Sequence, residues 1–194
     1  YLTWMRRGVL SREQARAVKT DREVYIARAI DDLTEMVLEV GEETAIGLRG
    51  LFEIAQCHEV EGKIDEAIDL YKGTVSQIAT SLEQADELGL TGEMQGFLFE
   101  MLQEVYVRTA GVMIREGAAD TAKLFEQFRA HMTAFGEKGA DLFDVVGDQW
   151  GHLMLLAESR FFAESGDATK VAQALAMTQR VNEKHPNDYV GAKA

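Results

Sequence analysis

The feature that most constrains the fold of this chain is a stretch that reads as the tight turn between two antiparallel helices. Residues 51–58 and 62–71 each carry apolar side chains at helical spacing, with a glycine between the two runs. Gly62 supplies the backbone freedom that ends the first helix, and Asp65 lies where it caps or charges the start of the second. Ala67 keeps the second helix thin, so its neighbour can approach closely. Such a hairpin is the building unit of helical arrays.

The rest of the chain is also predicted to be helical. It has a single proline and many Ala, Glu, Leu and Gln residues, and no segment shows the alternation of a half-buried strand. A capping box at Ser11 and Gln14 opens the first helix. Periodicity and glycine turns predict seven helices, over residues 11–40, 43–61, 64–88, 91–116, 118–137, 142–164 and 168–184. We expect an N-terminal arm at 1–10, a single helical domain over 11–186 and a flexible tail at 187–194.

The hairpin sequence recurs along the chain. The segment Gly62–Ala67 is echoed by Gly117–Ala122 and, more weakly, by Gly166–Val171. The glycines that open these segments are 55 and then 49 residues apart. Internal similarity at such intervals indicates a repeat array.

The first of these units resembles the tetratricopeptide repeat (TPR) family. The residues that fall on the family's spacing are Leu51, Ile54, Ala55, His58, Ala67 and Tyr71. In the last unit Ala174, Val181 and Pro186 match the second helix and its terminating proline, whereas the middle unit has Glu126 where the family has an aromatic residue. A TPR unit is about 34 residues long, so the wider spacing here predicts a divergent array with longer helices. The resemblance implies an all-α, TPR-like α-solenoid that binds proteins in a concave groove.

Charge is distributed unevenly along the chain. The net charge is −13, yet residues 1–22 carry six basic and two acidic side chains. The acidic remainder would repel phosphates, so nucleic acid is excluded as a partner. The single cysteine, Cys57, rules out an internal disulfide and lies on an apolar helical face, where we expect a buried and inert thiol. The compartment stays open, and we favour a cytoplasmic location.

The first residues suggest proximity to a membrane. The sequence begins with Tyr1 rather than Met, and Trp4 is followed closely by Arg6 and Arg7. Aromatic residues followed by arginines are typical of the cytoplasmic edge of a membrane helix. One interpretation is therefore that a preceding segment tethers the protein to a membrane, and the alternative is an ordinary N-terminal arm. No run of eighteen apolar residues occurs in the chain itself.

No motif for catalysis, metal or cofactor binding is present in the sequence. The four histidines lack metal-ligand spacing with carboxylates, and Asp148 with His152 is best interpreted as a surface hydrogen bond. His58 is expected to fill a packing position between helices. The glycines occur singly at turns rather than in a phosphate-binding loop, and no nucleophile–base arrangement is evident. We expect a protein that is not an enzyme and has no cofactor.

Arginines on the predicted first helices of each pair are the candidate partner-binding residues. If the TPR resemblance holds, these helices line the groove, and its candidate residues are Arg49, Phe52, Gln56, Arg108, Arg115 and Arg160. Arginine is scarce in this acidic chain, so several on one face would hold a carboxylate or an acidic peptide. The alternative is that they pair with the chain's own Glu53, Glu104 or Glu164.

Three functional hypotheses follow. The first is a protein-interaction scaffold that binds another protein or peptide in a TPR-like groove, as the soluble part of a membrane-associated complex or as a homo-oligomer. The second is an antiparallel helical bundle that serves as a sensory or small-ligand-binding domain, with a Met- and Phe-rich interior. The third is a structural subunit of an assembly whose first helix is a docking arm.

Overall fold

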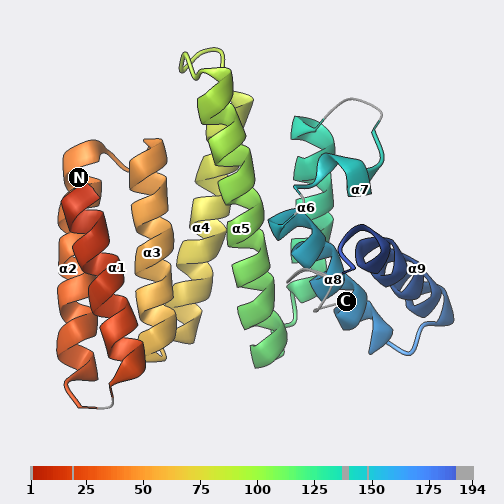
Figure 1. Cartoon of the computed structure of the whole chain (residues 1–194), viewed down its shortest axis with the longest axis horizontal. Helices are drawn as coiled ribbons and strands as arrows, with labels where there is room; N and C mark the ends of the chain where they lie inside the picture. Colours follow the sequence, from red (N-terminus) through yellow and green to blue (C-terminus); the bar gives the residue numbers. More distant parts are fainter. Residues whose placement is uncertain (1, 19, 137–139, 148, 187–194) are drawn as a thin grey trace. The chain divides into compact units, whose positions relative to one another are not determined.

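The computed structural model describes residues 2–18, 20–136, 140–147 and 149–186, which contain nine α-helices and no strand (Figure 1). The helices are α1 (Leu2–Ala17), α2 (Arg22–Val40), α3 (Ala45–Glu61), α4 (Ile64–Glu83), α5 (Gly92–Glu116), α6 (Thr121–Phe135), α7 (Leu142–Val145), α8 (Trp150–Ala163) and α9 (Ala168–Lys184). The predicted all-α class with sequential helical hairpins is confirmed. The expected number of seven helices is wrong, because two of the predicted helices are each divided in two.

The chain forms two compact units, Tyr1–Met101 and Leu102–Ala194, and α5 contributes to both. Each unit is described by itself. The single domain predicted over 11–186 stays a prediction, and the predicted tail at 187–194 lies outside the described residues. Within the described residues, no helix is both long and apolar enough to cross a membrane.

In the first unit, α1 to α4 run up and down beside one another, and α1 packs against both α2 and α3 (Figure 1). The core lies among these helices, and its buried members include Ala15, Ile26, Ala29, Leu33, Met36, Val37, Ile54, Cys57 and Val60. Burial raises the pKa of the Cys57 thiol to about 12, so the thiol is protonated at neutral pH, as expected for a structural cysteine. A glycine brings α2 and α3 together, since a Cβ at Gly50 would lie 2.5 Å from side-chain atoms of Met36 and Val37.

The predicted single helix over 11–40 is wrong, because the chain reverses direction between α1 and α2. Ser11, the expected helix start, is buried in the middle of α1, and residues 2–10, predicted as an arm, are helical. Asp21 adopts a left-handed conformation (φ 62°) at the start of α2. The reversal lets α1 pack on α2 at Gly8, where a Cβ would lie 2.6 Å from Cγ of Leu33. Tertiary packing therefore overrides a continuous helical pattern.

The predicted α3–α4 hairpin is confirmed. Gly62 ends α3 with φ 91°, and its N–H donates to the carbonyls of the last turn of that helix. Ala67 is completely buried, as close packing of the two helices requires. The hydroxyl of the buried Tyr71 donates to Oε2 of Glu59 at 3.0 Å, and its ring packs on Phe52 with centroids 5.7 Å apart. The hairpin is thus held by a buried aromatic pair and one cross-helix hydrogen bond.

In the second unit, the predicted helix over 142–164 is also divided, into α7 and α8. Asp141 caps α7 by accepting the N–H of Phe143 at 2.8 Å. The chain then turns extended at Val146, and the N–H of Gly147 donates to Oε1 of Gln103 at 2.7 Å. Gln103 is a buried residue of α5, so a distant side chain stabilises the break. By contrast, α9 has the predicted bounds 168–184.

Candidate binding groove

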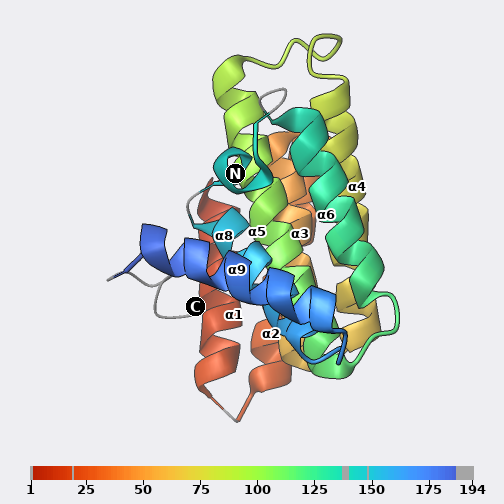
Figure 2. The same cartoon turned by 90° about the vertical axis from the view of Figure 1, so that its right-hand side faces the viewer.

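A groove opens in the second unit between α8 and α9, and α9 lies across α8 in Figure 2. Its volume is about 430 Å³, which is within the range of ligand pockets. The lining side chains are Arg129 from α6, Glu158, Ser159 and Phe162 from α8, and Lys170, Gln173, Ala174, Ala176, Met177 and Arg180 from α9. We call this site the α8–α9 groove.

One face of α9 supplies much of this lining. Its residues recur at helical spacing, in the order Lys170, Gln173, Ala174, Met177 and Arg180. The helix begins at Asp167, whose carboxylate accepts the N–H groups of Thr169 at 2.9 Å and Lys170 at 3.2 Å. Near its other end, the buried Val181 anchors α9 in the unit. The capped start and the buried anchor hold the face in place.

A bidentate ion pair joins α6 to α8 at the edge of the groove. Nε and Nη2 of Arg129 donate to the two carboxylate oxygens of Glu158 at 2.8 and 2.7 Å. The side chain of Glu158 is only 7% exposed, whereas that of Arg129 is 48% exposed. Hydrogen bonding to Glu158 raises the pKa of Arg129 above its ordinary value, against an opposing effect of burial. The two charges therefore compensate each other and fix the wall of the groove.

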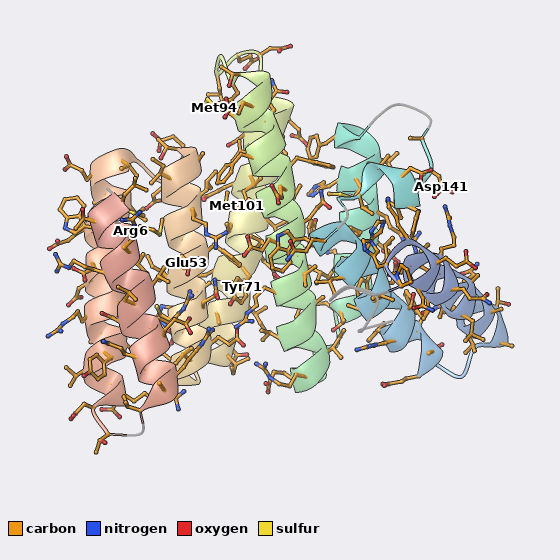
Figure 3. The ribbon with its side chains drawn as sticks, in the orientation of Figure 1. Arg6, Glu53, Tyr71, Met94, Met101 and Asp141 are labelled. Atoms are coloured by element: carbon orange, nitrogen blue, oxygen red, sulfur yellow. The ribbon has the colours of Figure 1, made fainter. Side chains whose placement is uncertain are left out.

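The two cations of α9 that line the groove, Lys170 and Arg180, are held more loosely. Nζ of Lys170 lies 4.8 Å from the ring centroid of Phe162, and among the described residues this lysine has no carboxylate partner. The guanidinium carbon of Arg180 lies 4.4 Å from the ring centroid of Phe143. Nη1 of Arg180 is also 3.3 and 3.4 Å from the oxygens of Asp141, which is exposed at the start of α7 (Figure 3). These distances are at the long end for hydrogen bonds, so the contact between Arg180 and Asp141 is a loose one.

Apolar groups lie between these cations. Ala174 is buried, and Met177 and Phe162 are half-buried. The hydroxyl of Ser159 donates to the backbone carbonyl of Leu155 at 2.8 Å, so it is engaged in its own helix rather than directed into the groove. The arrangement therefore suits a ligand that has carboxylates at its ends and an apolar group between them.

The predicted site residues of the first unit are either paired or buried within that unit. Arg49 pairs with Glu53 at 2.8 Å, as the alternative interpretation of the sequence expected. Phe52 and Gln56 are buried in α3. Glu53 also pairs with Arg12 of α1, and the Gln56 amide donates to it at 3.4 Å. We call Arg12, Arg49, Glu53 and Gln56 the Glu53 cluster; Figure 3 labels Glu53 on α3.

The predicted residues of the second unit do not line the α8–α9 groove. Arg108 is half-buried on α5, and Arg115 pairs with the neighbouring Glu116 at 2.9 Å. Arg160 is exposed on α8, outside the groove. Because the two units are described separately, a groove shared by the six predicted residues stays a prediction.

The sequence analysis missed Arg129, Lys170 and Arg180. Lys170 and Arg180 were placed on a second helix of a pair, which the TPR resemblance assigns to the outside of the array. Their positions on one helical face, with Ala174 and Met177 between them, were the available signal. Arg129 had no such signal, because its partner Glu158 lies 29 residues away in the sequence.

Two buried histidines, His152 and His185, connect α8 with α7 and with the end of α9. Nε2 of His152 lies 3.1 Å from the carbonyl oxygen of Phe143, which only accepts, so Nε2 is the donor. In the neutral ring Nδ1 then accepts from Nε2 of His185, 2.9 Å away. His152 is buried, so the prediction of a surface hydrogen bond is wrong for this residue; Asp148 lies outside the described residues. Among the residues that the structure describes, no three His, Cys, Asp or Glu side chains group as a metal site requires.

His58 occupies a position between helices, as predicted. Its side chain is half-buried, and Nδ1 lies 3.6 Å from Glu61 and 3.5 Å from Glu66 of the next helix.

Comparison with known protein families, curated protein sequences and solved structures finds no match for this chain. The resemblance to the TPR family therefore stays a prediction from the residues quoted above.

Proposed function

We propose that this protein is a protein-interaction module that binds an acidic segment of a partner protein in the α8–α9 groove. The observation that carries the proposal is the pair of exposed, loosely held cations, Lys170 and Arg180, on either side of an apolar floor. The groove is lined by three cations and one anion, in a chain whose net charge is −13. A local positive site in an acidic protein selects for acidic ligands and disfavours basic ones.

The construction of the groove supports binding of a peptide. Its walls are helices, and the Arg129–Glu158 pair joins two of them. The protein therefore loses little conformational entropy when a ligand binds. An extended segment can contact the cations through its carboxylates while an apolar side chain covers Met177 and Phe162. Affinity then comes mainly from the apolar contact, and orientation from the charges.

The test is binding of a fluorescent peptide that contains Glu and Leu, measured by anisotropy. We expect the double variant Lys170→Glu/Arg180→Glu to weaken binding at least tenfold, because two attractive contacts become repulsive. The matched control is Arg160→Glu, which reverses a charge on the exposed surface of α8 outside the groove. This control should bind within about twofold of the parent, because Arg160 does not line the groove and exposed charges are screened by salt.

Two results would refute the proposal. The first is equal weakening by Arg160→Glu and by the groove variants, which would reveal non-specific attraction to the surface. The second is failure of the parent protein to bind the Glu- and Leu-containing peptide more tightly than the same peptide with Gln in place of Glu.

The groove volume favours a second candidate, a small anionic ligand. A volume of about 430 Å³ accommodates a small organic molecule as readily as a peptide side chain. An aliphatic dicarboxylate that raises the melting temperature, with no binding of the Glu- and Leu-containing peptide, would select this function.

A further inference from the structure

We infer that the α8–α9 groove selects its ligand by the spacing of acidic residues. The ligand is an extended segment with two carboxylates four residues apart and an apolar residue midway between them, so that all three side chains share one face. This inference rests on the function proposed above and adds the pattern that the partner must carry. It follows from the positions of the groove's cations along one straight helix.

The first step is the separation of the two loosely held cations. Lys170 and Arg180 lie ten residues apart on α9, which corresponds to about 15 Å along the helix axis at 1.5 Å per residue. An extended peptide advances roughly 3.3 Å per residue. Successive side chains of an extended segment point to opposite faces, so residues an even number of positions apart share a face. Two carboxylates of an extended ligand therefore match the two cations when they are four residues apart, at roughly 13 Å.

The second step is that the groove is too small to enclose a helical ligand. A helix about 15 Å long and 10 Å wide encloses roughly 1,000 Å³, whereas the groove holds about 430 Å³. An extended segment fits, because it inserts only the side chains that face the groove.

The third step concerns the position between the two carboxylates. The groove surface there consists of the buried Ala174 and the half-buried Met177 on α9, with Phe162 on α8. The small Ala174 leaves room for a ligand side chain, and the flexible Met177 can adapt to its shape. A branched apolar residue such as Leu would remove apolar surface from water at this point.

The fourth step explains why a carboxylate is disfavoured at the centre. Arg129 donates two hydrogen bonds to Glu158, so its charge is already compensated and attracts a central carboxylate only weakly. The apolar surface of Ala174, Met177 and Phe162 would also desolvate a central carboxylate without giving it a hydrogen-bond partner. The groove therefore excludes a uniformly acidic segment as well as selecting a spaced pair.

The experiment uses a series of labelled peptides of one composition and length, each with two Glu and one Leu on a Gly/Ser background. The Glu residues are adjacent in one peptide, four apart in a second with Leu midway between them, five apart in a third, and nine apart in the last. We expect the four-residue spacing to bind at least tenfold more tightly than the adjacent and the nine-residue spacing. The five-residue spacing should also bind more weakly than the four-residue spacing, because its two carboxylates face opposite sides of an extended chain. Replacing the central Leu by Glu should also weaken binding.

A variant on the protein side tests which groups select the spacing. Lys170 is exposed, so Lys170→Gln should fold normally while removing one of the two contacts. With this variant the spaced and the adjacent peptides should bind equally, whereas Arg160→Gln should keep the preference of the parent protein.

The outcomes separate the inference from the proposed function. If every spacing binds equally and Lys170→Glu/Arg180→Glu still abolishes binding, the groove binds acidic peptides but the spacing inference is overturned. If no peptide of the series binds, both fail. If Lys170→Gln still binds the spaced peptide more tightly than the adjacent one, the inference is also overturned, since a group other than Lys170 would then determine the preferred spacing.

Discussion

Arginine residues have opposite roles in the two units of this protein. In the Glu53 cluster of the first unit, the side chains of Arg12 and Glu53 are only 7% and 3% exposed, and their charges are satisfied inside the unit. In the α8–α9 groove of the second unit, Arg180 is exposed and has a long contact with Asp141. A buried pair fixes how helices pack, whereas an exposed and loosely paired cation can exchange partners. Burial and pairing, rather than residue type, therefore distinguish a structural arginine from a candidate binding residue.

The largest effect that would test this comparison is expected from Glu53→Ala. The substitution removes the buried carboxylate that pairs with Arg12 and leaves this arginine only the exposed Glu13, so we expect the free energy of unfolding to fall by about 3 kcal/mol. Urea unfolding followed by circular dichroism measures the change. Glu35→Ala, on an exposed position of α2, is the control and should stay within about 0.5 kcal/mol of the parent. A loss below about 1 kcal/mol for Glu53→Ala would show that the cluster does not stabilise the first unit.

A second test replaces the packing glycine of the first unit. Gly50→Ala places a methyl group 2.5 Å from atoms of Met36 and Val37, so we expect a loss of about 1–3 kcal/mol. Gly73→Ala on α4 is the matched control, because no atom lies within 4 Å of the added Cβ. That control should stabilise the protein by up to about 1 kcal/mol through helix propensity. Equal effects of the two substitutions would contradict the close approach of α2 and α3.

An intermediate effect is expected from Arg129→Ala at the wall of the groove. The substitution removes two hydrogen bonds from the buried carboxylate of Glu158, and we expect a cost of about 1–3 kcal/mol. The same urea unfolding assay applies. The double variant Arg129→Ala/Glu158→Gln should recover part of the loss, because no unpaired charge then remains buried. If the double variant is the less stable of the two, the ion pair is not the source of the effect.

The smallest effect on stability is expected from Lys170→Gln and Arg180→Gln. Both side chains are exposed, and neither belongs to a buried ion pair, so each change should alter the free energy of unfolding by less than about 0.5 kcal/mol. Thermal and urea unfolding measure this directly. If either substitution lowers the free energy of unfolding by more than about 1 kcal/mol, the cation stabilises the fold as the Glu53 cluster does. The contrast between structural and loosely paired cations would then be wrong.

Much of the helical structure was predictable from local patterns. The bounds of α9 follow from Asp167 as cap and from the stop before Pro186, and the α3–α4 hairpin follows from Gly62. The breaks within 11–40 and 142–164 were not predictable, because their causes lie elsewhere in the chain. One depends on the packing of Gly8 against Leu33, and the other on the hydrogen bond from Gly147 to Gln103.

The candidate site was predictable only in part. The prediction from the sequence relied on scarce cations that share one helical face, and the order of Lys170, Ala174, Met177 and Arg180 along α9 shows the same pattern. The predicted residues, such as Arg49, lie instead on the first helix of each pair, because the TPR resemblance assigns the inner face of the groove to those helices. Arg49 pairs with Glu53 inside its own unit, which makes it a weaker candidate for binding a partner. This pairing depends on the burial of Glu53, which no local sequence pattern reveals.

The sequence by itself determined that this chain is all-helical, where its hairpins turn and which helical faces are apolar. These properties arise from interactions within about four residues, namely helix periodicity, caps and glycine turns. The tertiary structure decided where helices break, which charges are buried in pairs and which cations border a groove. Those properties depend on contacts between residues distant in the chain, such as Arg12 with Glu53 and Arg129 with Glu158, and such contacts exist only once the helices have packed.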